Sequence, residues 1–158
     1  MIKEQPVDDD VRAFGTELGR KALGREWPAV HAMLAPWLRA TWTIEQVRQF
    51  FEDEYRATVE ANGAEGTHFP EYPEPGLDGN GFTKATQLRE PISFAGGKVR
   101  NVAPEVTDDN VRYWLKLQLQ CTDAQMEKLG FDSFCEAWMA VVDTAEGLRV
   151  GYWSQGAY

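Results

Sequence analysis

Apolar residues recur at helical spacing over the first 60 residues of the chain, and this pattern predicts three helices. The first helix can begin at the acidic run 8–10, which supplies N-cap side chains, and can end at Gly24. Gly15 and Gly19 lie inside it, and each destabilises a helix by about 1 kcal/mol relative to Ala. We therefore expect a helix that is either weak or closely packed. Its apolar face consists of Val11, Phe14 and Leu18.

The second predicted helix starts at Pro28, whose fixed φ suits a first helical position. Pro36 removes a backbone hydrogen bond further along, so we expect the helix to kink there or to end near Ala35. The buried stripe of this helix consists of Val30, Met33, Leu34, Trp37 and Leu38.

The third predicted helix carries the clearest start signal. Thr43 and Gln46 form a capping box, and Trp42 can pack across it against Val47. An Asn-Gly pair at 62–63 ends the helix. Its apolar face consists of Val47, Phe50, Phe51, Tyr55 and Val59.

Proline and glycine interrupt the chain from 63 to 91, a stretch far longer than the usual loop of about 4 to 6 residues. We expect an ordered flap, because His68, Tyr72 and other aromatic side chains within it can dock on the body, and a short strand within 83–89. The stretch 78–81, Asp-Gly-Asn-Gly, lacks the flanking carboxylates of a calcium loop, so we interpret it as a glycine-rich turn.

The last third of the chain shows the twofold alternation of strands. Residues 111–121 alternate apolar and polar side chains, which predicts a long half-buried strand after a turn at 108–110. Residues 137–143 and 148–154 predict a hairpin in which Gly147 supplies a positive φ. A shorter hairpin is predicted from 92–94 and 98–102.

Helices first and paired strands last are typical of an α+β fold, here a single domain, 1–158, with N-terminal helices packed on a strongly bent antiparallel sheet. In this order, and in the apolar helix pair that runs into 43–55, the chain resembles the nuclear transport factor two-like proteins over about two-thirds of its length. The resemblance implies a cone-like, cystatin-like body with a concave pocket. It carries over no catalytic residue, because no motif matches residue by residue.

Composition narrows the class of partner. Six Trp and 43% hydrophobic residues indicate a packed globule, and the net charge of −9 argues against nucleic acid or an anionic membrane as partner. No apolar run suits a signal peptide or a membrane span, so we expect a cytoplasmic protein. Cys121 and Cys135 are then expected to be buried free thiols.

Four residues are candidates for lining a ligand pocket: His31, Tyr55, His68 and Tyr72. His31 lies at the edge of an apolar stripe, where a histidine bonded to a neighbour is the commoner alternative to a general base. His68 lies among glutamates, but no second His or Cys completes a zinc set, so we predict no metal and no cofactor.

The remaining candidates are interface residues. Trp114 falls on the polar side of its strand beside Lys116 and Gln118, and Trp153 lies in the last strand. Tryptophan on a polar strand face is typical of interfaces. The alternative is that another helix or the flap covers Trp114.

Three functions fit these observations. The leading prediction is a non-catalytic binding or interaction module that could dimerise through its sheet face, because aromatic residues outnumber plausible catalytic groups. The second is a small-molecule-binding protein or enzyme that uses the cone pocket, with His31 or His68 near its mouth. The third is an acidic, immunity-type antagonist of a basic partner protein, which rests on net charge alone.

Overall fold

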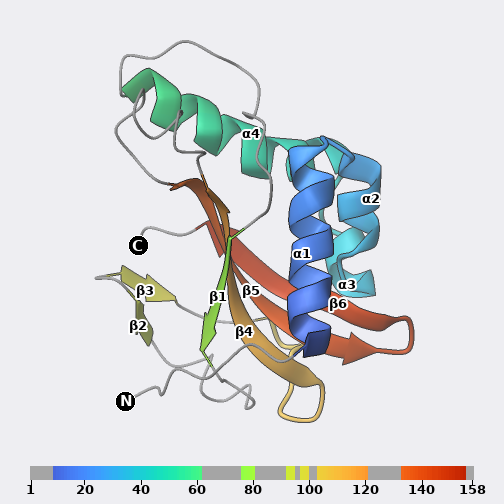
Figure 1. Ribbon diagram of the computed structural model, residues 1–158. Coiled ribbons are helices and arrows are strands. Elements are labelled where there is room, and N and C mark those ends of the chain that lie inside the picture. Colours follow the sequence, from blue (N-terminus) through green and yellow to red (C-terminus); the bar gives the residue numbers. More distant parts are fainter. Residues whose placement is uncertain are drawn as a thin grey trace.

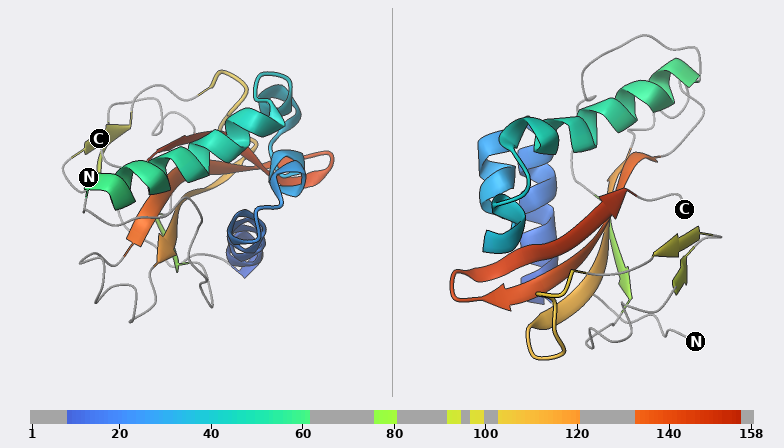
Figure 2. Two further views of the ribbon diagram at one scale, coloured as in Figure 1. Left: turned by 90° about the horizontal axis from the view of Figure 1, so that it is seen from above. Right: turned by 180° about the vertical axis from the view of Figure 1, so that it is seen from behind.

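The computed structural model describes residues 9–61, 76–80, 92–94, 97–99, 103–120 and 133–155, and over these residues it confirms the α+β class. The helices are α1 (Asp9–Leu23), α2 (Trp27–Ala32), α3 (Pro36–Arg39) and α4 (Ile44–Ala61). The strands are β1 (Gly76–Asn80), β2 (Ile92–Phe94), β3 (Gly97–Val99), β4 (Val111–Gln120), β5 (Ser133–Thr144) and β6 (Gly147–Gln155). Helices α1, α2 and α3 stand together beside the main sheet, and α4 runs across one end of it (Figures 1 and 2).

The glycines of α1 are accommodated by close packing, so the first helix is closely packed and not weak. Gly15 and Gly19 are both buried, on the same side as Val11 and Leu18. Two acidic residues in the first turn and two basic residues in the last turn complement the helix dipole. The helix therefore tolerates its glycines because they lie against other parts of the chain.

Pro36 separates two helices instead of kinking one. Helix α2 stops at Ala32, earlier than the predicted end near Ala35, and Pro36 opens α3. Ala35 is extended, with φ −61° and ψ 156°, which is the conformation that a residue before proline prefers. A linker, residues 33–35, therefore lies between the two helices; Met33 still has helical angles, with φ −85° and ψ −3°, and the chain is extended at Ala35.

The predicted capping box opens α4. The Thr43 backbone N–H donates to Gln46 Oε1 at 2.9 Å, and the Gln46 N–H donates to Thr43 Oγ1 at 3.1 Å. Val47, Phe50 and Phe51 are buried, as their spacing predicts. The side chains of the last residues of the predicted stripe, from 54 on, are outside the described part of the chain.

The main sheet has four antiparallel strands in the order β1-β4-β5-β6, and β2 and β3 form a separate two-stranded ribbon. The long strand and the hairpin of 137–143 with 148–154 are confirmed, and Gly147 has the predicted positive φ, 102°. The shorter hairpin is confirmed over 92–94 and 98–99; its second strand begins at Gly97, and 100–102 are outside the described residues. The turn predicted at 78–81 is wrong over 78–80, which belong to β1 and pair with β4. Backbone pairing along the long edge of β4 outweighs the poor strand preference of Gly, Asp and Asn. The strand expected within 83–89 and most of the flap are outside the described residues.

A bulge in β6 decides which side chains face the helices. Ala140 pairs with Tyr152 and Val141 pairs with Val150, so Gly151 is an extra residue in β6. Because of this extra residue, Val150 and Trp153 both pack into the core on the helix side of the sheet.

Two apolar clusters result, one on each face of the sheet. The helix-side core joins α1, α2 and α4 to Tyr113, Leu115, Leu117, Ala137, Met139, Val141, Val150 and Trp153. The far-side cluster consists of Ala35, Val106, Val111, Trp114, Trp138, Ala140 and Val142, with Trp37, Ala103 and Tyr152 packed against it. Within the ranges given above, no helix is both long and apolar enough to cross a membrane.

Candidate interaction surface

Trp114 lies at the centre of the far-side cluster and is fully buried. Its ring stacks on Trp138, with centroids 6.1 Å apart at 20°, and on Tyr152, with centroids 6.2 Å apart at 21°. Ala140 lies between Trp114 and Tyr152 in the register, and its small side chain leaves room above the sheet for both rings. Trp114 is therefore buried within the chain itself, in a cluster with Ala35 of the linker and Val106 of the loop before β4, whereas a helix or the flap was the expected cover.

The next register row continues this face of the sheet. Trp138 pairs with Lys116 on one side and with Ser154 on the other. Ser154 Oγ is a buried atom without a hydrogen-bond partner, although the residue as a whole is half-buried. Lys116 and Gln118 occupy register positions in β4, but only their backbone is described.

Trp138, Tyr152 and Ser154 are absent from the residues that the sequence singles out. Alternation along β5 could have found Trp138. It pairs with Lys116, which is two residues after Trp114 in β4 and therefore on the same face of the sheet. Tyr152 could not have been found in this way. Without the bulge, hairpin pairing would set Tyr152 opposite Met139, which belongs to the helix-side core.

Trp153 lies on the other face, inside the helix-side core. Its ring stacks on Phe50 at 4.3 Å and meets Trp42 edge-on at 5.2 Å. Its indole Nε1 is buried and has no hydrogen-bond partner. The two tryptophans predicted for one interface, Trp114 and Trp153, are therefore on opposite faces of the sheet.

His31 has a structural partner. Its Nε2 lies 2.7 Å from the Trp42 backbone O, and because a carbonyl only accepts, Nε2 is the donor. The bond ties α2 to the segment that leads into α4, as expected of a boundary histidine. Among the other pocket candidates, Tyr55 is described only as part of the α4 backbone, and His68 and Tyr72 are outside the described residues.

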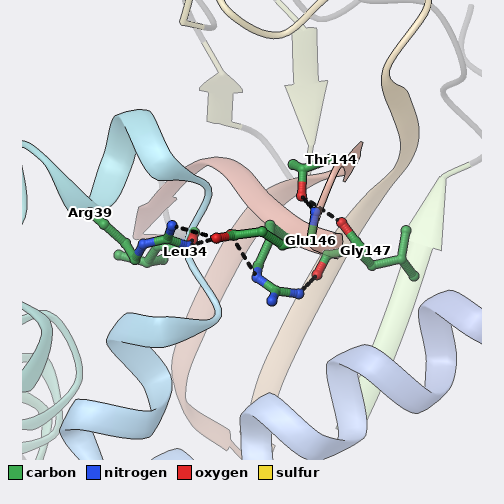
Figure 3. Close-up of polar contacts among 7 residues, drawn as sticks. Leu34, Arg39, Thr144, Glu146 and Gly147 are labelled. Atoms are coloured by element: carbon green, nitrogen blue, oxygen red, sulfur yellow. Dashed lines mark hydrogen bonds and ion pairs between the residues drawn. The ribbon is translucent and has the colours of Figure 1, made fainter.

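A polar cluster lies where α3 meets the turn between β5 and β6 (Figure 3). Arg39 binds Glu146 with two hydrogen bonds, 2.8 and 3.0 Å long, and donates a third, 2.7 Å long, to the Leu34 backbone O. Arg149 Nε lies 3.6 Å from the same carboxylate. The hydrogen bonds from Arg39 lower the pKa of Glu146 from its ordinary value. The cluster fastens the β5–β6 hairpin to the helical layer.

The described part of the chain shows no group of three His, Cys, Asp or Glu residues that could hold a metal ion. Comparison with known proteins gives no match to a family model, to a curated protein or to a solved structure. Function has to be argued from the residues themselves.

Proposed function

We propose that this protein is a non-catalytic interaction module whose recognition surface is the far face of the sheet beside Trp138, Tyr152 and Ser154. The observation that carries this proposal is the aromatic character of that face. An antiparallel sheet with helices on one side ordinarily presents polar side chains on the other. Here two Trp and one Tyr stack there instead.

The far-side cluster is covered unevenly by its own chain. Ala35 and Val106 belong to it and are fully buried, and the loop that carries Val106 leads directly into β4. Further along the strands, Tyr152 and Ser154 stay half-buried. Tyrosine at the rim of an apolar cluster combines a large contact area with a hydroxyl group, a combination that is enriched at interfaces.

Ser154 lies at the same rim and is half-buried, although its Oγ atom is enclosed by the protein's own chain. We propose a second copy of the chain as the first partner to test, in a cytoplasmic protein related to the nuclear transport factor two-like group. Such a pairing through one face would be two-fold symmetric.

Sedimentation velocity over a series of concentrations tests this function. We expect a dimer in the wild type and at least tenfold weaker association in Tyr152→Lys, because the ammonium group would be buried against the partner. Gln49→Lys, at an exposed position of α4, adds the same charge and should leave association unchanged. A wild type that stays monomeric, or equal effects of the two substitutions, would contradict the proposal for a second copy.

A second function, the acidic antagonist of a basic partner, is favoured by one surface. Glu105, Asp108 and Asp109 are exposed on the loop before β4. Asp143 is exposed as well. It lies beside this loop, because its backbone N–H donates to the Asn110 backbone O at 2.7 Å. For this function we expect binding of a basic partner that weakens with salt and with Asp108→Asn plus Asp109→Asn. Binding that is indifferent to both would remove this alternative.

A further inference from the structure

Among the described strands, β6 ends the main sheet, so its edge turned away from β5 has no neighbouring strand within that part of the chain. The backbone groups along such an edge are a template for pairing with another chain. The middle of β6, Arg-Val-Gly-Tyr-Trp at 149–153, is rich in residues that favour strands. A copy of the same strand would suit this edge.

The linker between α2 and α3 occupies part of this edge. Val150 donates its N–H to the Met33 backbone O at 3.0 Å and accepts from the Ala35 N–H at 2.8 Å. Leu34 and Val150 thus form an isolated parallel bridge, and Leu34, Ala35 and Val150 are all fully buried. Both backbone groups that an additional strand would bind at Val150 are already used.

Side chains from α3 hold the linker in place. Trp37 Nε1 donates to the Gly151 backbone O at 2.8 Å, so the bulge carbonyl at this edge is used as well. Arg39 donates to the Leu34 backbone O and binds Glu146 on the adjacent hairpin turn (Figure 3). Pro36 requires Ala35 to be extended, which is the conformation the bridge needs.

We propose that residues 33–39 are an edge clamp that prevents β6 from pairing with β6 of a second copy. A single parallel bridge adds little to the stability of a sheet, yet the indole of Trp37 and the guanidinium group of Arg39 both anchor this one. Its effect is to occupy the hydrogen-bonding groups at the point where β6 bulges. Pairing of a second copy along β6 is thereby blocked at Val150 and Gly151.

Ala35→Pro tests the clamp. The native φ of −61° already suits proline, so the substitution removes the N–H and the bond to Val150 without changing the backbone angles at this residue. We expect sedimentation velocity to show an assembly larger than that of the wild type, with self-association stronger by roughly tenfold for each backbone hydrogen bond released to a second copy. Loss of this anchor at Ala35 should release the linker from the edge, so that the Val150 N–H also loses its bond to the Met33 backbone O. Amide hydrogen exchange of Val150 should then be fast at low protein concentration and slow at high concentration.

Two results for Ala35→Pro would overturn the proposal. One is an Ala35→Pro protein that is folded by circular dichroism and associates no more than the wild type. The other is association during which the Val150 amide remains fast to exchange, because pairing would then involve another surface. If Ala35→Pro does not fold, Trp37→Phe carries the same test, since it removes the indole N–H that bonds to Gly151 and keeps an aromatic ring at this position. A wild type that already pairs through β6 would also refute the clamp.

Discussion

Gly151→Ala tests whether the bulge in β6 needs glycine because of packing. A Cβ at this position would lie 2.7 Å from Val142 Cγ1, 3.0 Å from Val142 Cγ2 and 3.2 Å from Trp37 Cζ2. The first distance is far below van der Waals contact. Gly147, four residues earlier, gives the opposite situation, because a Cβ there would meet only Arg149 at 3.7 Å but the φ of +102° is unfavourable for any other residue.

The expected magnitude follows from two opposing effects. Overpacking a core costs about 1–3 kcal/mol, and replacing glycine reduces the entropy of the unfolded chain, which returns about 0.4–1 kcal/mol. We therefore expect Gly151→Ala to lower the free energy of unfolding by about 1–2 kcal/mol. Val142→Ala should cost about 2 kcal/mol alone through lost burial and a cavity, but it also removes both methyl groups that the new Cβ would meet.

Urea unfolding of the wild type, both single variants and the double variant measures the coupling between the two sites. We expect the double variant to be about 1–3 kcal/mol more stable than the sum of the single effects predicts, because the clash is absent. Gly147→Ala combined with Val142→Ala is the control and should be additive within about 0.5 kcal/mol. Additivity of Gly151→Ala with Val142→Ala would refute the packing explanation.

Three further predictions concern single contacts. Thr43→Ala should lower the free energy of unfolding by about 1 kcal/mol in urea titrations, because it removes the side-chain cap on the Gln46 N–H; no loss would mean that water replaces the cap. The folded-state pKa of Glu146 is lowered, so its contribution to stability is present above the unfolded pKa of about 4.3 and is lost as pH falls through the lower folded value. The free energy of unfolding of Glu146→Gln should therefore differ from that of the wild type at neutral pH and approach it in acid. A difference that does not depend on pH would contradict the ion pair with Arg39. Ser154→Ala should leave stability unchanged or raise it slightly in thermal unfolding, because the hydroxyl has no partner to lose; a loss above about 1 kcal/mol would contradict this.

The starts and ends of the helices can be predicted from the sequence, because a few neighbouring residues determine each of them. The capping box at Thr43 depends only on a residue three positions away, and the end of α2 depends on Pro36. The bridge between Leu34 and Val150 has no such signal. Its partners are more than a hundred residues apart, and the apolar spacing that placed Leu34 in a helical stripe is equally satisfied by a buried extended residue.

The strand half shows where alternation stops being informative. Alternation correctly separates Trp114 from Leu115 and Leu117, but it assumes that the polar-looking side of a strand is exposed. That assumption fails at Trp114, because Trp114 is buried in one apolar cluster with Ala35 of the linker before α3 and Val106 of the loop before β4. β1 escaped prediction for a related reason. Its Gly, Asp and Asn residues carry no strand signal, and the pairing is determined by the edge that β4 offers.

The same extra residue, Gly151, links the far face and the edge of the sheet. By adding one position to β6 it turns Tyr152 toward the far-side cluster, while its carbonyl at the edge accepts the Trp37 indole N–H. A side chain at Gly151 would press on Val142 and Trp37 together, and these belong to, or pack against, the cluster that carries Trp114. A substitution at Gly151 should therefore disturb both the edge clamp and the far face of the sheet.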